Sequence, residues 1–244
     1  DEEVSSLGSA ALLAEAAERC QIGLTFEPAA EPDGTLAGGR KGSGNFAAAI
    51  TGRAAHAGRN PEDGRNALVA AADLAVRLDA MKRERDTLSV NPAKLDGGGP
   101  NNVVPERAVL RWNVRPLTME DQHWAEARQK DILAEIGTRH DVTIDVTGGF
   151  ARPPKPLDDR QMGLFSLVKE CGADLDQRIG WKDTGGVCDG NNLAAAGLAV
   201  VDTMGVRGGA IHSDREFLIV DSLTERAQLA ALTLLRLAEG RLAA

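Results

Sequence analysis

The sequence predicts one α/β domain that is interrupted by an inserted α+β domain. Residues 42–150 contain the expected order strand, helix, strand, strand, helix, strand, and a segment rich in glycine or proline bounds them on each side. The flanking regions contain apolar residues at helical spacing and short apolar strands. The length of 244 residues suits two domains. We therefore assign residues 42–156 to the inserted domain, and residues 1–41 and 157–244 to the interrupted domain.

The first flanking region contains one expected helix and one expected strand. Residues 4–20 carry apolar side chains at helical spacing, and Gly23 follows closely as a stop signal. Residues 22–26 are short and apolar, which is typical of a buried strand. Pro28 ends this strand because proline cannot donate a hydrogen bond to a neighbouring strand. Residues 29–44 are rich in Gly, Pro, Asp and Ala, so we predict a linker there.

The inserted domain alternates strand patterns with two amphipathic helices. A turn signal of three glycines and a proline separates its two central strands. The order of elements is that of the split βαββαβ unit of ferredoxin-like folds. The expected elements are a strand over Asn45–Gly52, a helix over 67–78, strands over Thr87–Leu95 and Val103–Val114, a helix over 119–136 and a strand over Val142–Thr147.

The second flanking region begins with the stiff segment Arg152–Pro156, which contains three prolines. A helix is expected over 158–171 and an apolar strand over Gly197–Thr203. Ser222 and Glu225 have the spacing of a capping box, which predicts the start of a final helix.

The composition excludes several classes of partner. Lys and Arg number 28 and Asp and Glu 36, for a net charge of −8, which argues against binding to nucleic acid or to anionic membranes. No apolar run approaches the roughly 20 residues that span a bilayer. Cys20, Cys171 and Cys188 are too few for a disulfide framework, so we expect a reducing, cytoplasmic compartment. The chain opens on Asp1 without a methionine, and we expect an upstream part to be missing.

Four positions carry side chains that are suited to catalysis. Glu2 and Glu3 are adjacent carboxylates, and Glu27 ends an apolar strand, which is where ligands bind in open α/β sheets. His212 lies in a glycine-rich loop after an apolar strand. Zinc accepts carboxylate and imidazole ligands, so Glu3, Glu27 and His212 are candidate metal ligands. Glu2 could then act as a general base on water that a metal activates.

Several segments in order along the chain resemble one enzyme family. The chain resembles the zinc-dependent aminoacylases, acetylornithine deacetylases and bacterial glutamate carboxypeptidases, which carry an inserted dimerisation or lid domain. The resemblance spans nearly all 244 residues. The segments that carry it are Asp1-Glu2-Glu3, Phe26-Glu27-Pro28, Thr51–Gly58, Asn101–Pro105 with Asn113-Val114-Arg115, and Gly209–Ser213.

The resemblance implies roles for individual residues. It implies that Glu2 is the general base, that Glu3, Glu27 and His212 are zinc ligands, and that His56 crosses a homodimer interface to hold the oxyanion in the partner's site. It also implies that Asn102 and Arg115 bind substrate. Arginine suits a substrate carboxylate because its planar guanidinium binds carboxylates through two parallel hydrogen bonds. Gly185 and Gly186 resemble part of the family's glycine-rich substrate loop.

The same family binds two zinc ions, and two of its ligands precede the acidic motif with which this chain opens. We therefore expect zinc binding by this chain to be incomplete or absent, and the chain itself to be inactive. For the parent protein we predict a metal-dependent hydrolase of amide bonds in N-acyl amino acids or small peptides. Two alternatives stay open: a dimerisation or binding module without catalysis, and a ureide or carbamoyl amidohydrolase on the same scaffold.

Overall fold

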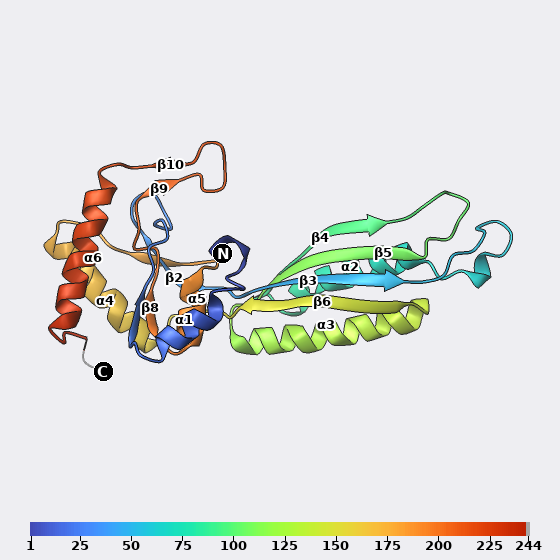
Figure 1. Ribbon diagram of the computed structural model, residues 1–244, viewed down its shortest axis with the longest axis horizontal. Helices are drawn as coiled ribbons and strands as arrows, with labels where there is room; N and C mark the ends of the chain where they lie inside the picture. Colours follow the sequence, from blue (N-terminus) through green and yellow to red (C-terminus); the bar gives the residue numbers. More distant parts are fainter. Residues whose placement is uncertain (243–244) are drawn as a thin grey trace. The chain divides into compact units, whose positions relative to one another are not determined.

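The computed structural model describes residues 1–242, and these form two compact units. The first unit consists of residues 1–41 and 152–242, and the second of residues 42–151 (Figure 1). The second junction therefore lies a few residues before the boundary at 156 that we expected from the sequence. Each unit has its own hydrophobic core.

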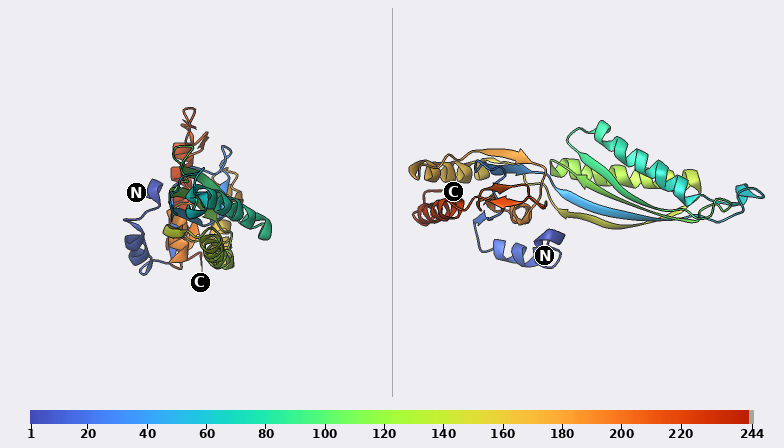
Figure 2. Two further views of the ribbon diagram at one scale, coloured as in Figure 1. Left: turned by 90° about the vertical axis from the view of Figure 1, so that its right-hand side faces the viewer. Right: turned by 90° about the horizontal axis from the view of Figure 1, so that it is seen from above.

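The second unit has the expected βαββαβ order. Helices α2 and α3 both cover one face of its sheet (Figures 1 and 2). The strand order β4-β5-β3-β6 places β4 and β6 at the two edges. The elements are β3 (Ser43–Thr51), α2 (Ala67–Glu84), β4 (Ser89–Gly97), β5 (Arg107–Arg115), α3 (Met119–His140) and β6 (Thr143–Arg152), with the short 3-10 helix η2 (Pro61–Asp63) before α2.

The core of the second unit follows from the spacing of its apolar residues. Leu74, Leu78 and Met81 lie three or four positions apart on α2, so they share one face, and all three are buried against the sheet. Trp112 on β5 is also buried, and its indole Nε1–H donates to Oε1 of Gln129 at 2.6 Å. This hydrogen bond satisfies the polar end of a large apolar ring between β5 and α3.

Strand β6 is longer than the sequence predicts, because a glycine in its middle does not end it. Gly148 has a φ of +95°, a conformation that side-chain-bearing residues rarely adopt. A Cβ at this position would lie 2.1 Å from the carbonyl oxygen of Asn45 on the neighbouring strand β3. The glycine therefore permits a close approach of two strands, and the strand continues to Arg152.

The first unit contains three short strand pairs surrounded by helices. Strand β1 pairs in parallel with β8, β2 pairs in parallel with β7, and β9 pairs antiparallel with β10. The elements are η1 (Glu2–Val4), α1 (Ala10–Ala17), β1 (Ile22–Leu24), β2 (Leu36–Arg40), α4 (Asp159–Asp174), β7 (Trp181–Thr184), α5 (Asp189–Ala195), β8 (Ala199–Val201), β9 (Gly208–Gly209), β10 (Phe217–Leu218) and α6 (Ser222–Ala238).

The linker predicted over residues 29–44 is wrong, because this segment contains β2 and the start of β3. All five residues of β2 are buried. Its glycines allow close packing: a Cβ at Gly39 would lie 2.9 Å from Oδ1 of Asp183, whose carboxylate accepts the Gly39 N–H at 2.7 Å. The small residues that suggested a flexible linker therefore form a buried strand.

The segment that follows β6 belongs to the first unit, and this corrects the boundary at 156. Lys155 and Arg40 exchange two backbone hydrogen bonds of 2.8 and 2.9 Å, as neighbouring antiparallel residues do. Arg152 donates to the backbone carbonyl of Glu2 at 2.7 Å. These bonds attach residues 152–156 to β2 and to the amino-terminal turn.

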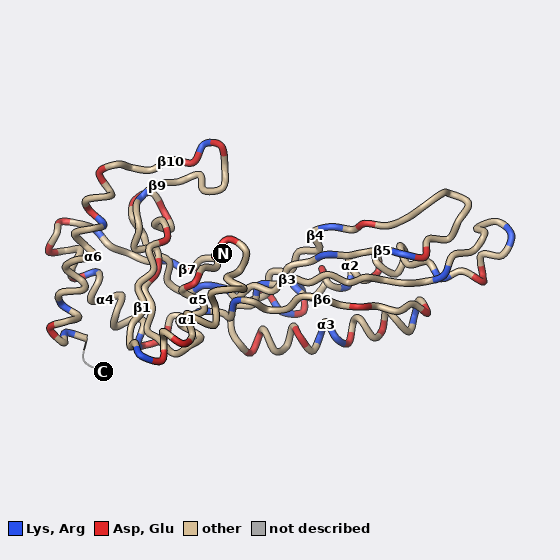
Figure 3. The backbone as a smooth tube through the Cα atoms, in the orientation of Figure 1, with Lys and Arg blue, Asp and Glu red and all other residues tan. Residues whose placement is uncertain are grey.

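Acidic and basic residues are interspersed along both units (Figure 3). Asp73 on α2 is the centre of one such group: its carboxylate lies 3.0 Å from Nε of Arg77 and 2.9 Å from Nε2 of His140 on α3. The hydrogen bond to His140, followed by that to Arg77, lowers the pKa of Asp73. Among residues 1–242, no helix is both long enough and apolar enough to cross a membrane.

The lowered pKa of Asp73 predicts how the second unit responds to acid. Folding lowers the pKa of such a carboxyl group, so the group stabilises the fold at any pH above its pKa in the unfolded chain. This stabilisation is lost as the pH falls through the pKa of the group in the folded protein. We expect Asp73→Asn to unfold at lower urea concentration than the wild type at pH 7. The difference should shrink as the pH falls below about 4. An unchanged difference at pH 3, measured by urea titration, would contradict this assignment.

Candidate functional site

Polar residues gather in the first unit where its parallel strands end. Glu27 follows β1, Asp202 follows β8, and Arg40 is the last residue of β2. Gly185 and Gly186 follow β7, the parallel partner of β2. Ligands bind at the carboxyl ends of strands in open α/β sheets, so these residues mark the candidate site.

A buried group of charged side chains lies beneath this edge. Asp202 is fully buried, and its carboxylate accepts two hydrogen bonds from Arg40, Nε to Oδ2 at 2.8 Å and Nη2 to Oδ1 at 2.9 Å. Nζ of Lys155, also fully buried, lies 3.3 Å from Oδ2 of Asp202 and donates to the Gly38 carbonyl at 2.5 Å. Burial lowers the pKa of Lys155.

The three glutamates singled out from the sequence lie close enough to affect one another. Burial, followed by the negative charges of Glu2, Asp202 and Glu3, raises the pKa of Glu27, and only the charge of Arg40 opposes them. A raised carboxyl pKa in a strand-end cluster is typical of a functional site. The negative charges of Glu2 and Glu3 therefore act on Glu27, although the three carboxylates do not lie close enough together to hold a metal ion.

Glu2 is held by an arginine that the sequence analysis did not single out. Arg152 is buried, its Nη1 donates to the Glu2 carboxylate, and its Nη2 donates to Oγ of Ser6 at 2.9 Å. The Ser6 hydroxyl in turn donates to Asp189 at the start of α5. The side chain of Glu2 is therefore oriented by a buried hydrogen-bond network, although Glu2 itself lies near the chain end.

His212 lies in an exposed loop. It is exposed in the loop between β9 and β10, with a left-handed backbone at φ 63°. Within residues 1–242, no group of three or more His, Cys, Asp and Glu side chains lies close enough together to hold a metal ion. As the structure places them, Glu3, Glu27 and His212 do not fit a metal ion as one ligand set.

Gly185 and Gly186 form a small loop against Arg40. The Gly186 N–H donates to Oγ1 of Thr184 at 3.3 Å, and a Cβ on Gly186 would lie 3.4 Å from Nη1 of Arg40. Cys188, just beyond this loop, is buried, and burial raises the pKa of its thiol to about 11. A thiol with so high a pKa is a poor nucleophile near neutral pH.

His56 and Asn102 lie together at one end of the second unit. His56 forms an isolated β-bridge with Val103, and the Ala57 N–H donates to the Asn102 carbonyl at 2.9 Å. Gly52, at the base of this tip, must lack a side chain, because a Cβ there would lie 2.0 Å from the Arg65 carbonyl oxygen. Two predicted site residues, 46 positions apart in the chain, are thereby brought together.

Arg115 lies at the opposite end of the same sheet. The β3–β5 register pairs Thr51 with Arg107 near the His56 end and Gly44 with Val114 near the Arg115 end. Strand β5 from Arg107 to Arg115 is therefore about 27 Å long at 3.4 Å per residue. One copy of this unit cannot place His56 and Arg115 on the same small substrate.

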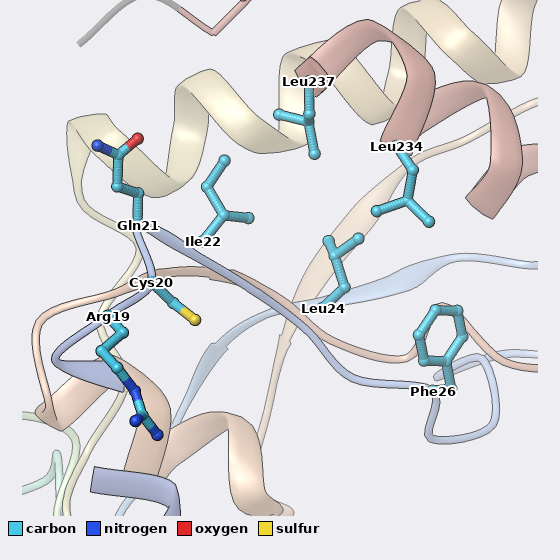
Figure 4. Close-up of a pocket in the computed structure, with 8 residues that line it drawn as sticks. All are labelled: Arg19, Cys20, Gln21, Ile22, Leu24, Phe26, Leu234 and Leu237. Atoms are coloured by element: carbon cyan, nitrogen blue, oxygen red, sulfur yellow. The ribbon is translucent and has the colours of Figure 1, made fainter. Parts of the chain in front are cut away.

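An apolar groove lies elsewhere in the first unit. Its volume is about 600 Å³, and Ile22 and Leu24 of β1 face Leu234 and Leu237 of α6 across it (Figure 4). Within the described residues, β1 pairs with β8 on one side only. None of the predicted site residues lines the groove, which is completed by Arg19, Cys20, Gln21 and Phe26.

Asp202 and Arg152 are residues of the candidate site that the sequence reasoning missed. Asp202 directly follows an apolar strand, so the argument that identified Glu27 could also have found it. Arg152 precedes two prolines in what looked like a linker, and nothing local in the sequence indicates that it is buried against Glu2.

Comparison with known proteins finds similar sequences. Residues 38–141 match the family described as peptidase dimerisation domain. The chain is 33% identical over 254 residues to carboxypeptidase G2 of Pseudomonas sp. (strain RS-16), an alignment that covers 99% of the chain and 58% of that protein. It is also 35% identical over 102 residues to indole-3-acetyl-aspartic acid hydrolase of Enterobacter agglomerans. This alignment covers 41% of the chain and 23% of that protein.

A solved structure shows the same fold. A dinuclear metal binding peptidase of the M20 family from Bacillus subtilis matches with a TM-score of 0.73 and 18% identity, over 98% of the chain and 63% of that protein. The chain therefore spans little more than half the length of the relatives it matches.

The buried charge group generates a stability prediction. Asp202→Ala would leave Arg40 and Lys155 buried without their common partner, and removing one partner of a buried ion pair typically costs about 3–5 kcal/mol. We expect a correspondingly large fall in the free energy of unfolding, measured by urea titration. The matched control is Glu31→Ala, which breaks the exposed pair with Lys182 and should cost about 1 kcal/mol or less. Equal losses in the two variants would contradict the role of Asp202.

Proposed function

The chain belongs to the M20 family of peptidases that carry a dimerisation domain, and from this premise we propose that the full-length protein hydrolyses amide bonds in N-acyl amino acids or small peptides. The observation that carries the proposal is the set of polar residues at the carboxyl ends of the parallel strands, with Glu27 after β1, together with Glu2, whose carboxylate Arg152 binds. Two carboxylates beside a polar strand edge supply the acid–base groups that amide hydrolysis needs.

Glu2 is the proposed general base. Arg152 holds its carboxylate in one orientation, so that it can take a proton from the attacking water and later give it to the leaving amine. An oriented base reacts faster than a mobile one, because the geometry of proton transfer is already set.

His56 and Arg115 are proposed to serve one substrate from two chains. The substrate carboxylate would bind Arg115 of one chain, and His56 of the partner subunit would donate a hydrogen bond to the oxygen of the scissile carbonyl. The distance of about 27 Å along β5 supports this division, since one chain cannot supply both groups. Asn102, next to His56, and the Gly185-Gly186 loop complete the proposed substrate contacts.

We propose a homodimer that forms through the second unit. Strand β4 is an edge strand, and Val69 and Val76 are exposed on α2, with Val76 66% exposed. An edge strand beside apolar side chains favours pairing with a second copy through the same surface.

Zinc is the metal ion proposed for the full-length protein, with Glu3, Glu27 and His212 among its ligands. Glu3, Glu27 and His212 do not form one ligand set in the present arrangement, so we derive no chemical step through the ion. Metal analysis of the full-length protein tests this assignment. We also propose a cytoplasmic location, which the three free cysteines support.

The proposed substrates are amides of amino acids with a free carboxylate. Indole-3-acetyl-aspartic acid is such an amide, and it is the substrate in the name of one relative. Arg115, at the end of β5, is the group proposed to bind that carboxylate. A panel of N-acyl aspartates and glutamates, with a ureide and a carbamoyl amino acid beside them, separates this proposal from the alternative amidohydrolases.

Replacing Glu2 tests the proposed base. We expect Glu2→Gln in the full-length protein to lower kcat on the best substrate of the panel by about two to four orders of magnitude, the usual contribution of a general base. Metal content should stay unchanged, since Glu2 is not a proposed ligand. Glu15→Gln, an exposed glutamate on α1, is the control and should keep wild-type turnover. Near wild-type turnover of Glu2→Gln would refute the assignment.

Mixed dimers test whether His56 acts across the interface. Glu2→Gln and His56→Ala subunits should each be inactive alone. In a mixed dimer, one site combines intact Glu2 from one chain with intact His56 from the other. After exchange of equal amounts, about a quarter of wild-type activity should return, because half of the dimers are mixed and one of their two sites is complete. No recovery in dimers shown to be mixed would contradict the cross-dimer role.

A further inference from the structure

The imidazole of His56 is folded over its own turn and bound by two backbone amides. The Gly58 N–H donates to Nδ1 at 3.1 Å, and the Arg59 N–H donates to the same atom at 3.2 Å. Both groups are obligatory donors, so Nδ1 must present its lone pair to them.

This contact determines where the proton lies on the neutral ring. A neutral imidazole carries a single N–H, and the hydrogen bond made by one ring nitrogen decides which nitrogen holds it. Since Nδ1 accepts from Gly58 and Arg59, the proton lies on Nε2. Nε2 does not take part in these two hydrogen bonds, so the neutral side chain offers its single N–H donor at Nε2 and uses its acceptor within the turn.

The backbone around His56 is fixed from both sides. The Val104 N–H donates to the Ala55 carbonyl at 2.9 Å, and the Ala57 N–H donates to the Asn102 carbonyl at 2.9 Å. The Arg59 N–H also reaches the His56 carbonyl at 3.2 Å, which closes the turn. The amides that bind the ring are therefore held in place by the same strand-like pairing that brings Asn102 to this tip.

We propose that the backbone N–H groups of Gly58 and Arg59 are positioning groups that hold His56 in the Nε2–H tautomer, so that this residue acts as a hydrogen-bond donor and not as a general base. The identity of the group that receives the hydrogen bond, a substrate carbonyl oxygen in the partner's site, rests on the proposed function. The tautomer itself rests only on the two hydrogen bonds to Nδ1.

The tautomer can be measured without substrate or metal. In the ¹⁵N-labelled chain with a neutral imidazole, the ring ¹⁵N shifts should show an unprotonated Nδ1 and a protonated Nε2. A scalar coupling across the hydrogen bond should join Nδ1 to the amide nitrogen of Gly58 or Arg59. A proton on Nδ1, or an absence of both couplings, would overturn the proposal whatever the enzyme activity.

Two substitutions at Gly58 separate the amide from the side chain. Gly58→Pro removes the N–H, whereas Gly58→Ala keeps it and places its Cβ at an ordinary 3.7 Å from Cε1 of His56. We expect the Pro variant to lose the coupling to residue 58 and to gain the Nδ1–H form, while the Ala variant keeps the wild-type ring spectrum. In the full-length protein, kcat of the Pro variant should be about tenfold below that of the Ala variant, a loss typical for the partner that orients a functional imidazole. Identical ring spectra and kcat in the two variants would overturn the positioning role.

Amide replacements of His56 provide a second test that does not depend on folding of the Pro variant. The side-chain amide of Gln can place an N–H near the position of Nε2, whereas that of the shorter Asn lies near Nδ1. With a donor role, His56→Gln should retain more activity than His56→Asn, which should lose about 10²–10³-fold, the usual loss for one oxyanion donor. Equal activities, or a better Asn variant, would overturn the donor role. If the full-length wild type hydrolyses no amide, the proposed function fails, and the ring spectra alone decide the tautomer.

Discussion

One buried carboxylate, Asp202, holds the first unit together. It binds Arg40 at the end of β2 and Lys155 in the segment that returns from the second unit, and all three side chains are nearly inaccessible to water. Charges can be buried at this depth only when each has a partner, so the relative position of these three chain segments is closely constrained. The polar strand edge with Glu27 lies above this group, and its electrostatics depend on the same residues.

The residue that follows Asp202 has an unfavourable backbone conformation. Thr203 has a φ of 60°, which is unfavourable for a β-branched residue. Its hydroxyl accepts the Ala37 N–H at 2.7 Å and donates to the Asp202 carbonyl at 2.5 Å. The hydrogen bond from Ala37 joins β2 to the end of β8, and the two bonds together compensate a conformation that would otherwise be rare.

Patterns of apolar spacing predicted most of the fold, and the misses have local physical causes. The βαββαβ unit follows from helix and strand periodicity, and the strand-end rule located Glu27. Strand β2 was missed because its residues are small, and small residues indicate turns unless a close neighbour such as Asp183 leaves no room for a side chain. The pairing of Arg152 with Glu2 is a tertiary contact between distant parts of the chain, which no local pattern encodes.

The one-sided pairing of β1 has a consequence for how the chain behaves in solution. Its outer edge has no strand partner among residues 1–242, and the apolar groove beside it leaves Phe26 and Leu234 more than half exposed. Unprotected strand edges with apolar neighbours are templates for aggregation. In concentrated solution β1 can add a strand from another molecule, which is a route to disordered polymers distinct from any symmetric dimer. The open edge of β1 is therefore a site at which aggregation is expected, separate from the surface through which we propose that two copies pair.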